Sequence, residues 1–399
     1  MRIDRADELV RDPEEPERAT FLELLFDVVF AFALTRVSQQ LLEAIGDGRR
    51  IGVMAIAETL VLLVAVWNVW IFTCWVTSRF NRLATAMHLL FSGLIVASLL
   101  LAVAMPQAFG DRGMLFAAAF VGAQVGRPIF LAVLLGGHPR RRNEIRLVCW
   151  ASLSGVFWIV GAVLPHEVRL PLWAVALAVD YLGVRLGWPA PWLGREQNAQ
   201  WRLAGAHLAE RYQQFLILAL GESVLFIGLT FSEGPLDFGR TVAFLVSVVS
   251  TLLLWQIYFQ RAGKLLPEAM GSTPNPGRLG QSSNYTQFAL VAGVLLTAVA
   301  NELAIADPLG DTHLAFSVVV LGGPIVFLIA RLRFEYEVFG RFAPPLLVGP
   351  LLLGALIPVM LLPPPLVGLV VATLLLAASG LGNLYHVRKR AVTTPNPPL

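Results

Sequence analysis

The chain has 399 residues, of which 56% are hydrophobic and only 14% are charged, and its mean hydropathy is +0.69. Soluble domains carry about 25% charged residues, so this composition excludes an ordinary soluble protein. The formal net charge is only +3, and its 30 lysines and arginines are scattered along the chain, which argues against a nucleic-acid-binding surface. We therefore expect an all-α polytopic membrane protein.

Twelve segments are long and apolar enough to be transmembrane helices, which need about 20 mainly apolar residues each. They cover residues 20–44, 52–78, 83–105, 113–136, 145–165, 169–187, 205–231, 238–262, 286–306, 313–333, 342–362 and 365–386. The long segment 263–285 is rich in Gly, Pro, Ser and Asn, which is typical of a mobile connector.

Acidic residues dominate the segment before the first predicted span, which has no apolar region typical of a signal peptide. The predicted organisation is an acidic cytoplasmic tail (1–19), a first six-helix half (20–187), a cytoplasmic joint (188–204), a second six-helix half (205–387) and a cytoplasmic tail (388–399). Glu17-Arg18 followed by Asp27 resembles Glu210-Arg211 followed by Glu222. This similarity predicts two parallel halves.

The distribution of basic residues predicts the orientation of the chain. With the amino-terminal tail in the cytoplasm, and with basic residues near the ends of spans counted with the adjoining loop, 22 Lys and Arg residues fall on the cytoplasmic side, five fall on the opposite side, and three lie deeper within spans. Cytoplasmic loops of membrane proteins are enriched in Lys and Arg. We therefore expect twelve spans, both termini in the cytoplasm, and a location in the bacterial cytoplasmic membrane.

Charged residues within the predicted spans are the candidate functional residues. His207, Arg211 and Glu222 fall within about 60° of one another on a helix and extend over about 22 Å of its axis. Such a polar stripe must face protein or water rather than lipid. The predicted orientation places His207 near the cytoplasmic surface and Glu222 near the middle of the membrane, and it places further charges in the cytoplasmic half of the membrane. The candidate coupling or substrate residues are Glu23, Asp27, Arg127, Asp180, His207, Glu210, Arg211 and Glu222.

Two interpretations of these charges are open. In the first, they form a structural network of ion pairs that holds the helices together. In the second, they line a cavity facing the cytoplasm, where Asp27 or Glu222 exchanges protons or binds a cation. The candidate acids outnumber the candidate arginines, and unpaired carboxylates need protons or cations for neutralisation. This excess favours the second interpretation.

Sequence motifs for catalysis are incomplete in this chain. Gly221-Glu222-Ser223 lacks the second glycine of a nucleophile elbow. His166-Glu167 lacks the second histidine of a helical zinc site. We expect no enzymatic activity, no cofactor and no metal site. The expected partners are the lipid bilayer and a small solute, proton or cation, and not nucleic acid.

Two motifs resemble the bacterial low temperature requirement protein A (LtrA) family. One is the Phe-Leu-Glu-Leu-Leu-Phe-Asp sequence at residues 21–27, and the other is the His-x-x-Glu-Arg and Leu-Gly-Glu-Ser pair within residues 207–223. Met105–Phe109 and Gln124–Arg127 are similar as well. The resemblance implies a multi-span membrane protein linked to growth in the cold. Gln39 and Gln287 stand where the family pattern leads us to expect histidine.

Our first functional hypothesis is a proton- or cation-coupled transporter or permease for a small solute. In it, Asp27 and Glu222 are the coupling carboxylates, Arg127 and Arg211 tune them or hold an anionic group, and His207 passes protons. The alternative is a non-transporting membrane protein for low-temperature or stress adaptation, in which the buried charges are structural.

Overall fold

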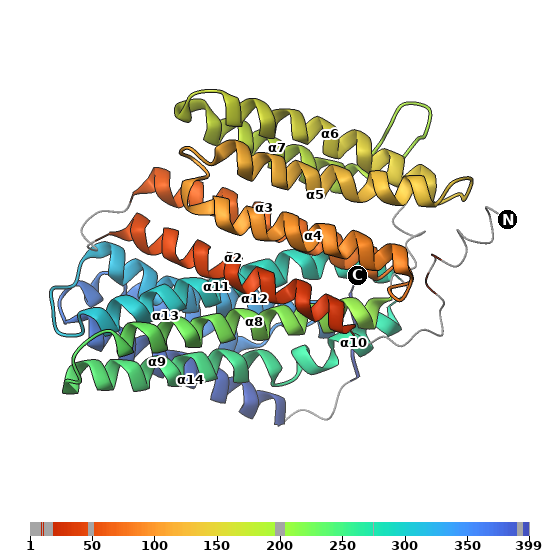
Figure 1. The fold of residues 1–399 in the computed structure, drawn as a ribbon. Helices are drawn as coiled ribbons and strands as arrows, with labels where there is room; N and C mark the ends of the chain where they lie inside the picture. The colour runs from red at the N-terminus through yellow and green to blue at the C-terminus, as the bar shows by residue number, and fades with distance from the viewer. Residues whose placement is uncertain are drawn as a thin grey trace. The chain divides into compact units, whose positions relative to one another are not determined.

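The structure confirms the all-α fold class. It is a computed structural model that describes residues 9, 11, 19–46, 52–195, 204–273, 275–388 and 394–398. These residues are mainly helical and include no β-strand (Figure 1). Most of the predicted amino-terminal tail, half of the predicted carboxyl-terminal tail, and residues 196–203 of the predicted joint lie outside the described residues. Contacts divide the chain into two compact units, Met1–Val37 with Met54–Leu208, and Ser38–Val53 with Ala209–Leu399.

The first unit contains the early helices of the chain. They are α2 (Phe21–Ile45, up to Val37), α3 (Val53–Thr77), α4 (Thr85–Ala104), the 3₁₀ turn η1 (Met105–Gln107), α5 (Gly113–Leu134), α6 (Arg141–Val163), α7 (His166–Leu186) and the first turn of α8. Helices α4, α5, α6 and α7 pack in sequence order, and α5, α6 and α7 lie side by side in Figure 1. Aromatic rings fill the contact between α6 and α7, where the ring centroids of Trp158 and Trp173 are 4.8 Å apart. Because short turns join these helices, the packing is local in sequence.

The second unit contains the later helices. They are α8 (Gly205–Ser232, from Ala209), α9 (Phe238–Phe259), α10 (Ala262–Ser272), α11 (Pro276–Ala306), α12 (Leu314–Phe339), α13 (Pro344–Leu356), the 3₁₀ turn η3 (Val359–Leu361) and α14 (Pro365–Arg388). Helix α12 packs against α11, α13 and α14 and is central to this unit. Glycines at the α11–α12 contact let the two backbones approach closely: a Cβ atom added at Gly323 would lie 2.7 Å from the backbone nitrogen of Thr297.

Each of the twelve predicted spans contains a described helix. Nine segments of the described chain are long and apolar enough to cross a membrane. Helices α2 and α7, which both carry several charged residues, are not among them. Helix α13 has 13 residues, about 20 Å of axis, and is short for a bilayer of about 30 Å. The structure thus agrees with a multi-span protein.

The prediction of a mobile connector at residues 263–285 is wrong. This segment forms most of α10 and the first three turns of α11, which begins at Pro276, a favoured residue for the first turn of a helix. Gly277, Gly280 and Ser283 of this segment are buried. The hydroxyls of Ser282 and Thr286 donate to the Glu337 carboxylate of α12 at 2.6 and 2.8 Å. The Gly and Ser content therefore reflects close helix packing.

The end predicted for the tenth span, residue 333, is also too early, because α12 continues to Phe339. Glu335 and Glu337 lie in this extension and Arg331 lies just before it, and their side chains are 2%, 1% and 0% exposed, respectively. Arg331 was counted with the adjacent cytoplasmic loop, yet it lies inside a helix bundle. The hydropathy pattern ended the span too early because it counts these charges as polar, whereas protein partners neutralise them inside the bundle.

Candidate functional site

The Glu23 side chain caps the helix that carries it. Thr20 and Glu23 form a capping box at the start of α2: the Thr20 backbone N–H donates to Glu23 Oε2 at 2.8 Å, and the Glu23 backbone N–H donates to Thr20 Oγ1 at 3.3 Å. This Thr-x-x-Glu pattern satisfies amide groups that the first turn of a helix leaves without partners. The position of the Glu23 carboxylate is thus fixed by its own helix.

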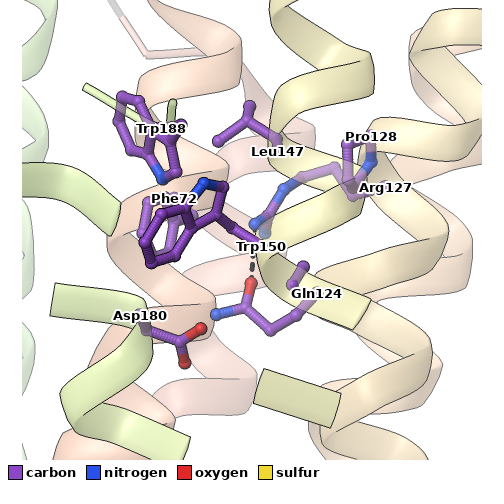
Figure 2. Close-up of a pocket in the computed structure, with 9 residues that line it drawn as sticks. Phe72, Gln124, Arg127, Pro128, Leu147, Trp150, Asp180 and Trp188 are labelled. Atoms are coloured by element: carbon purple, nitrogen blue, oxygen red, sulfur yellow. Dashed lines mark hydrogen bonds between the residues drawn. The ribbon is translucent and has the colours of Figure 1, made fainter. Parts of the chain in front are cut away.

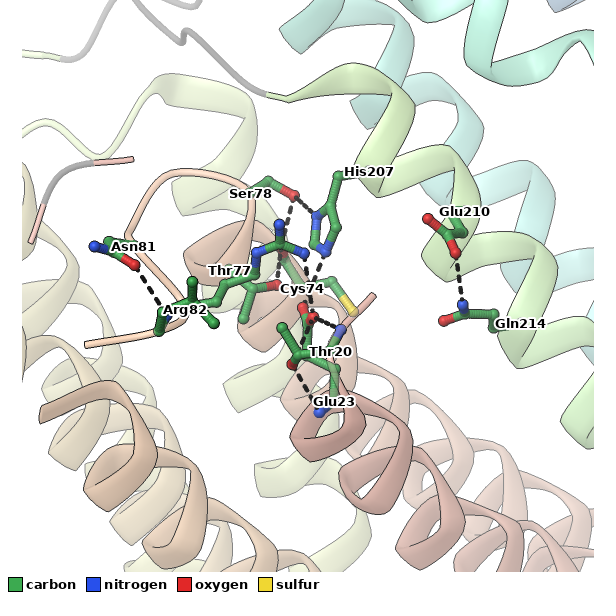
Figure 3. Close-up of polar contacts among 11 residues, drawn as sticks. Thr20, Glu23, Cys74, Thr77, Ser78, Asn81, Arg82, His207, Glu210 and Gln214 are labelled. Atoms are coloured by element: carbon green, nitrogen blue, oxygen red, sulfur yellow. Dashed lines mark hydrogen bonds and ion pairs between the residues drawn. The ribbon is translucent and has the colours of Figure 1, made fainter. Parts of the chain in front are cut away.

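The same carboxylate also contacts His207, at the start of α8 (Figure 3). This pairing was not predicted from the sequence. Glu23 Oε1 lies 3.0 Å from His207 Nε2, and Glu23 Oε2 lies 3.4 Å from Arg82 Nη1. On its other side, His207 Nδ1 lies 3.1 Å from Ser78 Oγ. His207 is 0% exposed and Glu23 is 1% exposed. The predicted position of His207 at the cytoplasmic surface therefore corresponds to a buried side chain.

Asp27 lies one turn further along α2 and has a different environment. Its Oδ1 accepts a hydrogen bond of 2.9 Å from the indole Nε1 of Trp70 in α3. Asp27 is 3% exposed and Trp70 is fully buried. A buried indole N–H needs an acceptor, and a carboxylate is a strong one. Trp70 is therefore a polar partner of Asp27 as well as a packing residue.

Arg127 of α5 and Asp180 of α7 line one small cavity, shown in Figure 2. Its volume is about 30 Å³. A buried water needs about 10–15 Å³, so the cavity has room for roughly two water-sized groups. Its walls are Phe72, Gln124, Arg127, Pro128, Leu147, Trp150, Ala151, Asp180 and Trp188. Asp180 Oδ2 is shielded from solvent and has no hydrogen-bond partner among the described residues.

The guanidinium of Arg127 is held by neighbours on α3 and α5. It donates to Gln124 Oε1 at 2.6 Å and to Thr73 Oγ1 at 3.3 Å, and it lies 5.5 Å from the centre of the Phe72 ring. These contacts use two of the five N–H donors of an arginine. Donors therefore remain for a bound group. Within the described residues no contact ion pair joins Arg127 to Asp180.

The end of α7 shapes one wall of this cavity. Gly187 has a left-handed backbone (φ 73°) and ends the helix, and the Trp188 N–H donates to the Gly183 carbonyl at 2.9 Å. This pattern is a Schellman motif, in which glycine takes the left-handed position. A side chain at Gly183 would meet the rings of Trp188 and Trp150 at about 3 Å. Both glycines are therefore needed to place the two tryptophans over the cavity.

The remaining predicted residues lie in the second unit, on α8. Arg211 and Glu222 are 1% and 2% exposed, as expected for a polar stripe that faces protein. Glu210 is partly exposed, and its Oε1 accepts a hydrogen bond of 3.0 Å from Gln214 (Figure 3). Glu23, Asp27, Arg127, Asp180 and His207 belong to the first unit. Among these, the structure joins Glu23 to His207 and places Arg127 beside the same cavity as Asp180.

Several residues of these sites were not predicted. They are Arg82, Ser78, Trp70, Gln124, Trp150 and Trp188, which were not among the candidate functional residues. One signal was available: Thr20 precedes Glu23 by three residues, which is a capping-box pattern. The others depend on contacts between distant segments. Across the described residues, no group of three or more His, Cys, Asp or Glu side chains could hold a metal ion.

Long apolar helices with charged side chains buried among them define a polytopic helical membrane protein. The profile of the family described as bacterial low temperature requirement A protein (LtrA) matches residues 18–380, and the chain belongs to this family. It is 34% identical over 324 residues to an uncharacterised protein of Rhizobium meliloti (strain 1021), covering 80% of this chain and 78% of that protein. No solved structure matches the chain. The family resemblance seen in the motifs is confirmed.

Proposed function

We propose that this protein is a proton- or cation-coupled transporter or permease for a small solute in the bacterial cytoplasmic membrane. It has twelve spans in two parallel six-helix halves, with both termini in the cytoplasm, and it is not an enzyme. The excess of basic residues on one side supports this orientation. In this proposal Asp27 and Glu222 are the coupling carboxylates, and Arg127 and Arg211 each tune them or hold an anionic group of the solute.

The open arrangement of Arg127 and Asp180 carries this proposal. In contrast, Arg331 and Glu335 form a closed ion pair, with Nη1 and Oε2 2.9 Å apart. At the cavity, a guanidinium and a carboxylate face the same small space without such contact. Two opposite charges in a low-dielectric interior attract strongly. Keeping them apart leaves a polar site for water or for a small group with a donor and an acceptor.

Transport should depend on the carboxylate of Asp180. In proteoliposomes with a pH-sensitive dye inside, we expect uptake of at least one of three probes, namely glycine, acetate or methylammonium. Asp180→Asn removes the negative charge and keeps the size of the side chain, and should lower uptake at least tenfold, equivalent to about 1.4 kcal/mol. The measurement is the initial rate of uptake of each labelled probe at equal amounts of inserted protein.

Glu167→Gln is the matched control for this variant, because Glu167 lies on the same helix and is exposed. It should transport like the wild type. Equal rates for wild type, Asp180→Asn and empty liposomes with all three probes would contradict the proposal.

Coupling should depend on Asp27 and Glu222. Their double variant Asp27→Asn, Glu222→Gln should separate solute movement from proton movement, so that the dye signal that accompanies uptake is lost. The matched control is Glu43→Gln with Glu233→Gln, which alters two exposed acids, one on α2 and one directly after α8. Identical proton movement in the wild type and the Asp27, Glu222 variant would exclude these residues as coupling groups.

The alternative function is a non-transporting membrane protein for low-temperature or stress adaptation. The observation in its favour is the closed network of α12, in which Glu337 accepts from Ser282, Thr286 and Arg333. If the buried charges serve only this purpose, the variants above should lose thermal stability in proportion to any loss of function. Loss of transport at unchanged stability would exclude this alternative.

A further inference from the structure

The hydroxyl of Ser78 lies between two hydrogen-bond partners in the Glu23–His207 site, a carbonyl oxygen and a ring nitrogen. Its Oγ is 2.8 Å from the carbonyl oxygen of Cys74, one turn earlier, and 3.1 Å from His207 Nδ1 (Figure 3). A serine hydroxyl has one proton to donate and two lone pairs that accept. Ser78 can thus donate to the carbonyl while accepting from the ring, or donate to the ring instead.

These two orientations match the two charge states of His207. In the imidazolium state both ring nitrogens carry protons: Nε2–H donates to Glu23 Oε1 at 3.0 Å, Nδ1–H donates to Ser78 Oγ, and Ser78 donates to the Cys74 carbonyl. In the neutral state Nδ1 has no proton and Ser78 turns its hydroxyl toward it, while Nε2–H still donates to Glu23. The proton change is thus confined to Nδ1.

The Cys74 carbonyl keeps partners in both states. It also accepts from the backbone N–H of Ser78 and from Thr77 Oγ1, each at 3.0 Å. A buried polar group left without a partner costs about 1–3 kcal/mol, and His207 is 0% exposed. In this site, loss of the Nδ1 proton leaves none of these groups unsatisfied. Rotation of one hydroxyl therefore keeps Nδ1 hydrogen-bonded in both charge states.

The groups on the Nε2 side of the His207 ring are held by contacts that do not involve Ser78. Glu23 is held by the backbone N–H of Thr20 at 2.8 Å and lies 3.4 Å from Arg82 Nη1. Among the described residues, the charged groups in contact with this site include the Glu23 carboxylate from α2 and the Arg82 guanidinium from the segment after α3. Neither of these contacts involves the Ser78 hydroxyl.

We propose that Ser78 is the positioning residue of a proton-exchange site at His207. The Nδ1 lone pair takes a proton from a hydronium ion, which leaves a water molecule, and the Ser78 hydroxyl turns to the Cys74 carbonyl. The reverse step returns the proton to water. Proton exchange at His207 does not depend on the proposed function. Only its role in transport rests on that function, and in that role the coupling ion is the proton.

The test is ¹⁵N NMR of the histidine rings in the full-length protein in nanodiscs, with the His207 signal assigned from a His207→Gln variant. Between about pH 5 and pH 8, we expect the wild-type Nδ1 signal to change from protonated to hydrogen-bonded acceptor, while Nε2 stays protonated. Ser78→Ala should abolish the hydrogen-bonded acceptor signal of Nδ1, and Ser78→Thr, which keeps the hydroxyl, should restore it. A single His207 state across this range in the wild type would overturn the proposal, as would an unchanged spectrum in Ser78→Ala.

Ser92→Ala is the matched control. Ser92 Oγ donates to the His88 carbonyl four residues earlier at 2.9 Å, as Ser78 does to Cys74, but Ser92 is exposed. This variant should leave the His207 signal unchanged. In liposomes, Ser78→Ala should slow proton movement at least tenfold and Ser78→Thr should not. Intact NMR behaviour without uptake of any probe would refute transport and leave the exchange site standing.

Discussion

Replacement of Glu335 by leucine is expected to be among the most destabilising single changes in the second unit. Glu335 holds the buried Arg331 guanidinium at 2.9 Å, and Arg331 Nε donates to the Ile257 carbonyl of α9 at 2.9 Å. Removing one partner of a buried pair leaves an uncompensated charge and costs about 3–5 kcal/mol. The unfolding equilibrium should therefore shift more than a hundredfold. Thermal unfolding in detergent micelles measures the effect.

The double variant Arg331→Met, Glu335→Leu is the control, because it removes both charges and keeps apolar volume. It should recover most of the stability lost in Glu335→Leu, since a buried pair replaced by packed apolar side chains is often neutral or better. If the double variant were as unstable as the single one, the loss would come from packing and the ion-pair account would fail.

Gly323→Ala is expected to destabilise the α11–α12 contact, although alanine favours helices over glycine by about 1 kcal/mol. The added methyl would lie 2.7 Å from the Thr297 backbone nitrogen and 3.0 Å from its Cα. Rotation of a side chain relieves neither contact, so the helices must separate. Overpacking of this kind costs about 1–3 kcal/mol. The midpoint of thermal unfolding should fall accordingly.

The adjacent Gly322 provides an internal control for this prediction. A Cβ at Gly322 has no atom within 4 Å. Gly322→Ala should therefore be neutral or stabilising by up to about 1 kcal/mol, because only the helix propensity changes. Opposite signs for two neighbouring glycines would show that backbone contact, and not helix propensity, sets the effect. Equal losses at both positions would contradict this explanation.

Much of the helical layout could be predicted from the sequence, because apolar runs of membrane length are a local property. The twelve predicted segments each contain a helix. The errors lie where tertiary contacts override local composition. Gly and Ser in 263–285 suggested a loose connector, yet most of this segment is helical and Ser282 donates to Glu337. The charges of Arg331 and Glu335 suggested the end of the tenth span, yet they neutralise each other within α12.

The candidate site was predictable in its charged members and not in its pairings. Hydropathy identifies Glu23, Asp27 and His207 because each interrupts an apolar run. It does not show that Glu23 and His207, which are 184 positions apart, share a hydrogen bond, or that Asp27 accepts from Trp70. Such pairings depend on the register between helices, which side-chain packing sets. The cavity beside Asp180 likewise requires the turn at Gly187, whose effect appears only in three dimensions.

The capping box of α2 has a mechanical consequence. A single carboxylate, that of Glu23, closes the first turn of this helix and also anchors the histidine at the start of α8. The first turn of α8 therefore cannot draw away from Glu23 without breaking the hydrogen bond, unless the α2 terminus unwinds or follows it. Fraying of the α2 terminus and displacement of the α8 terminus are thus coupled through the Glu23 carboxylate. We therefore expect amide exchange at residues 20–23 to change when His207 moves.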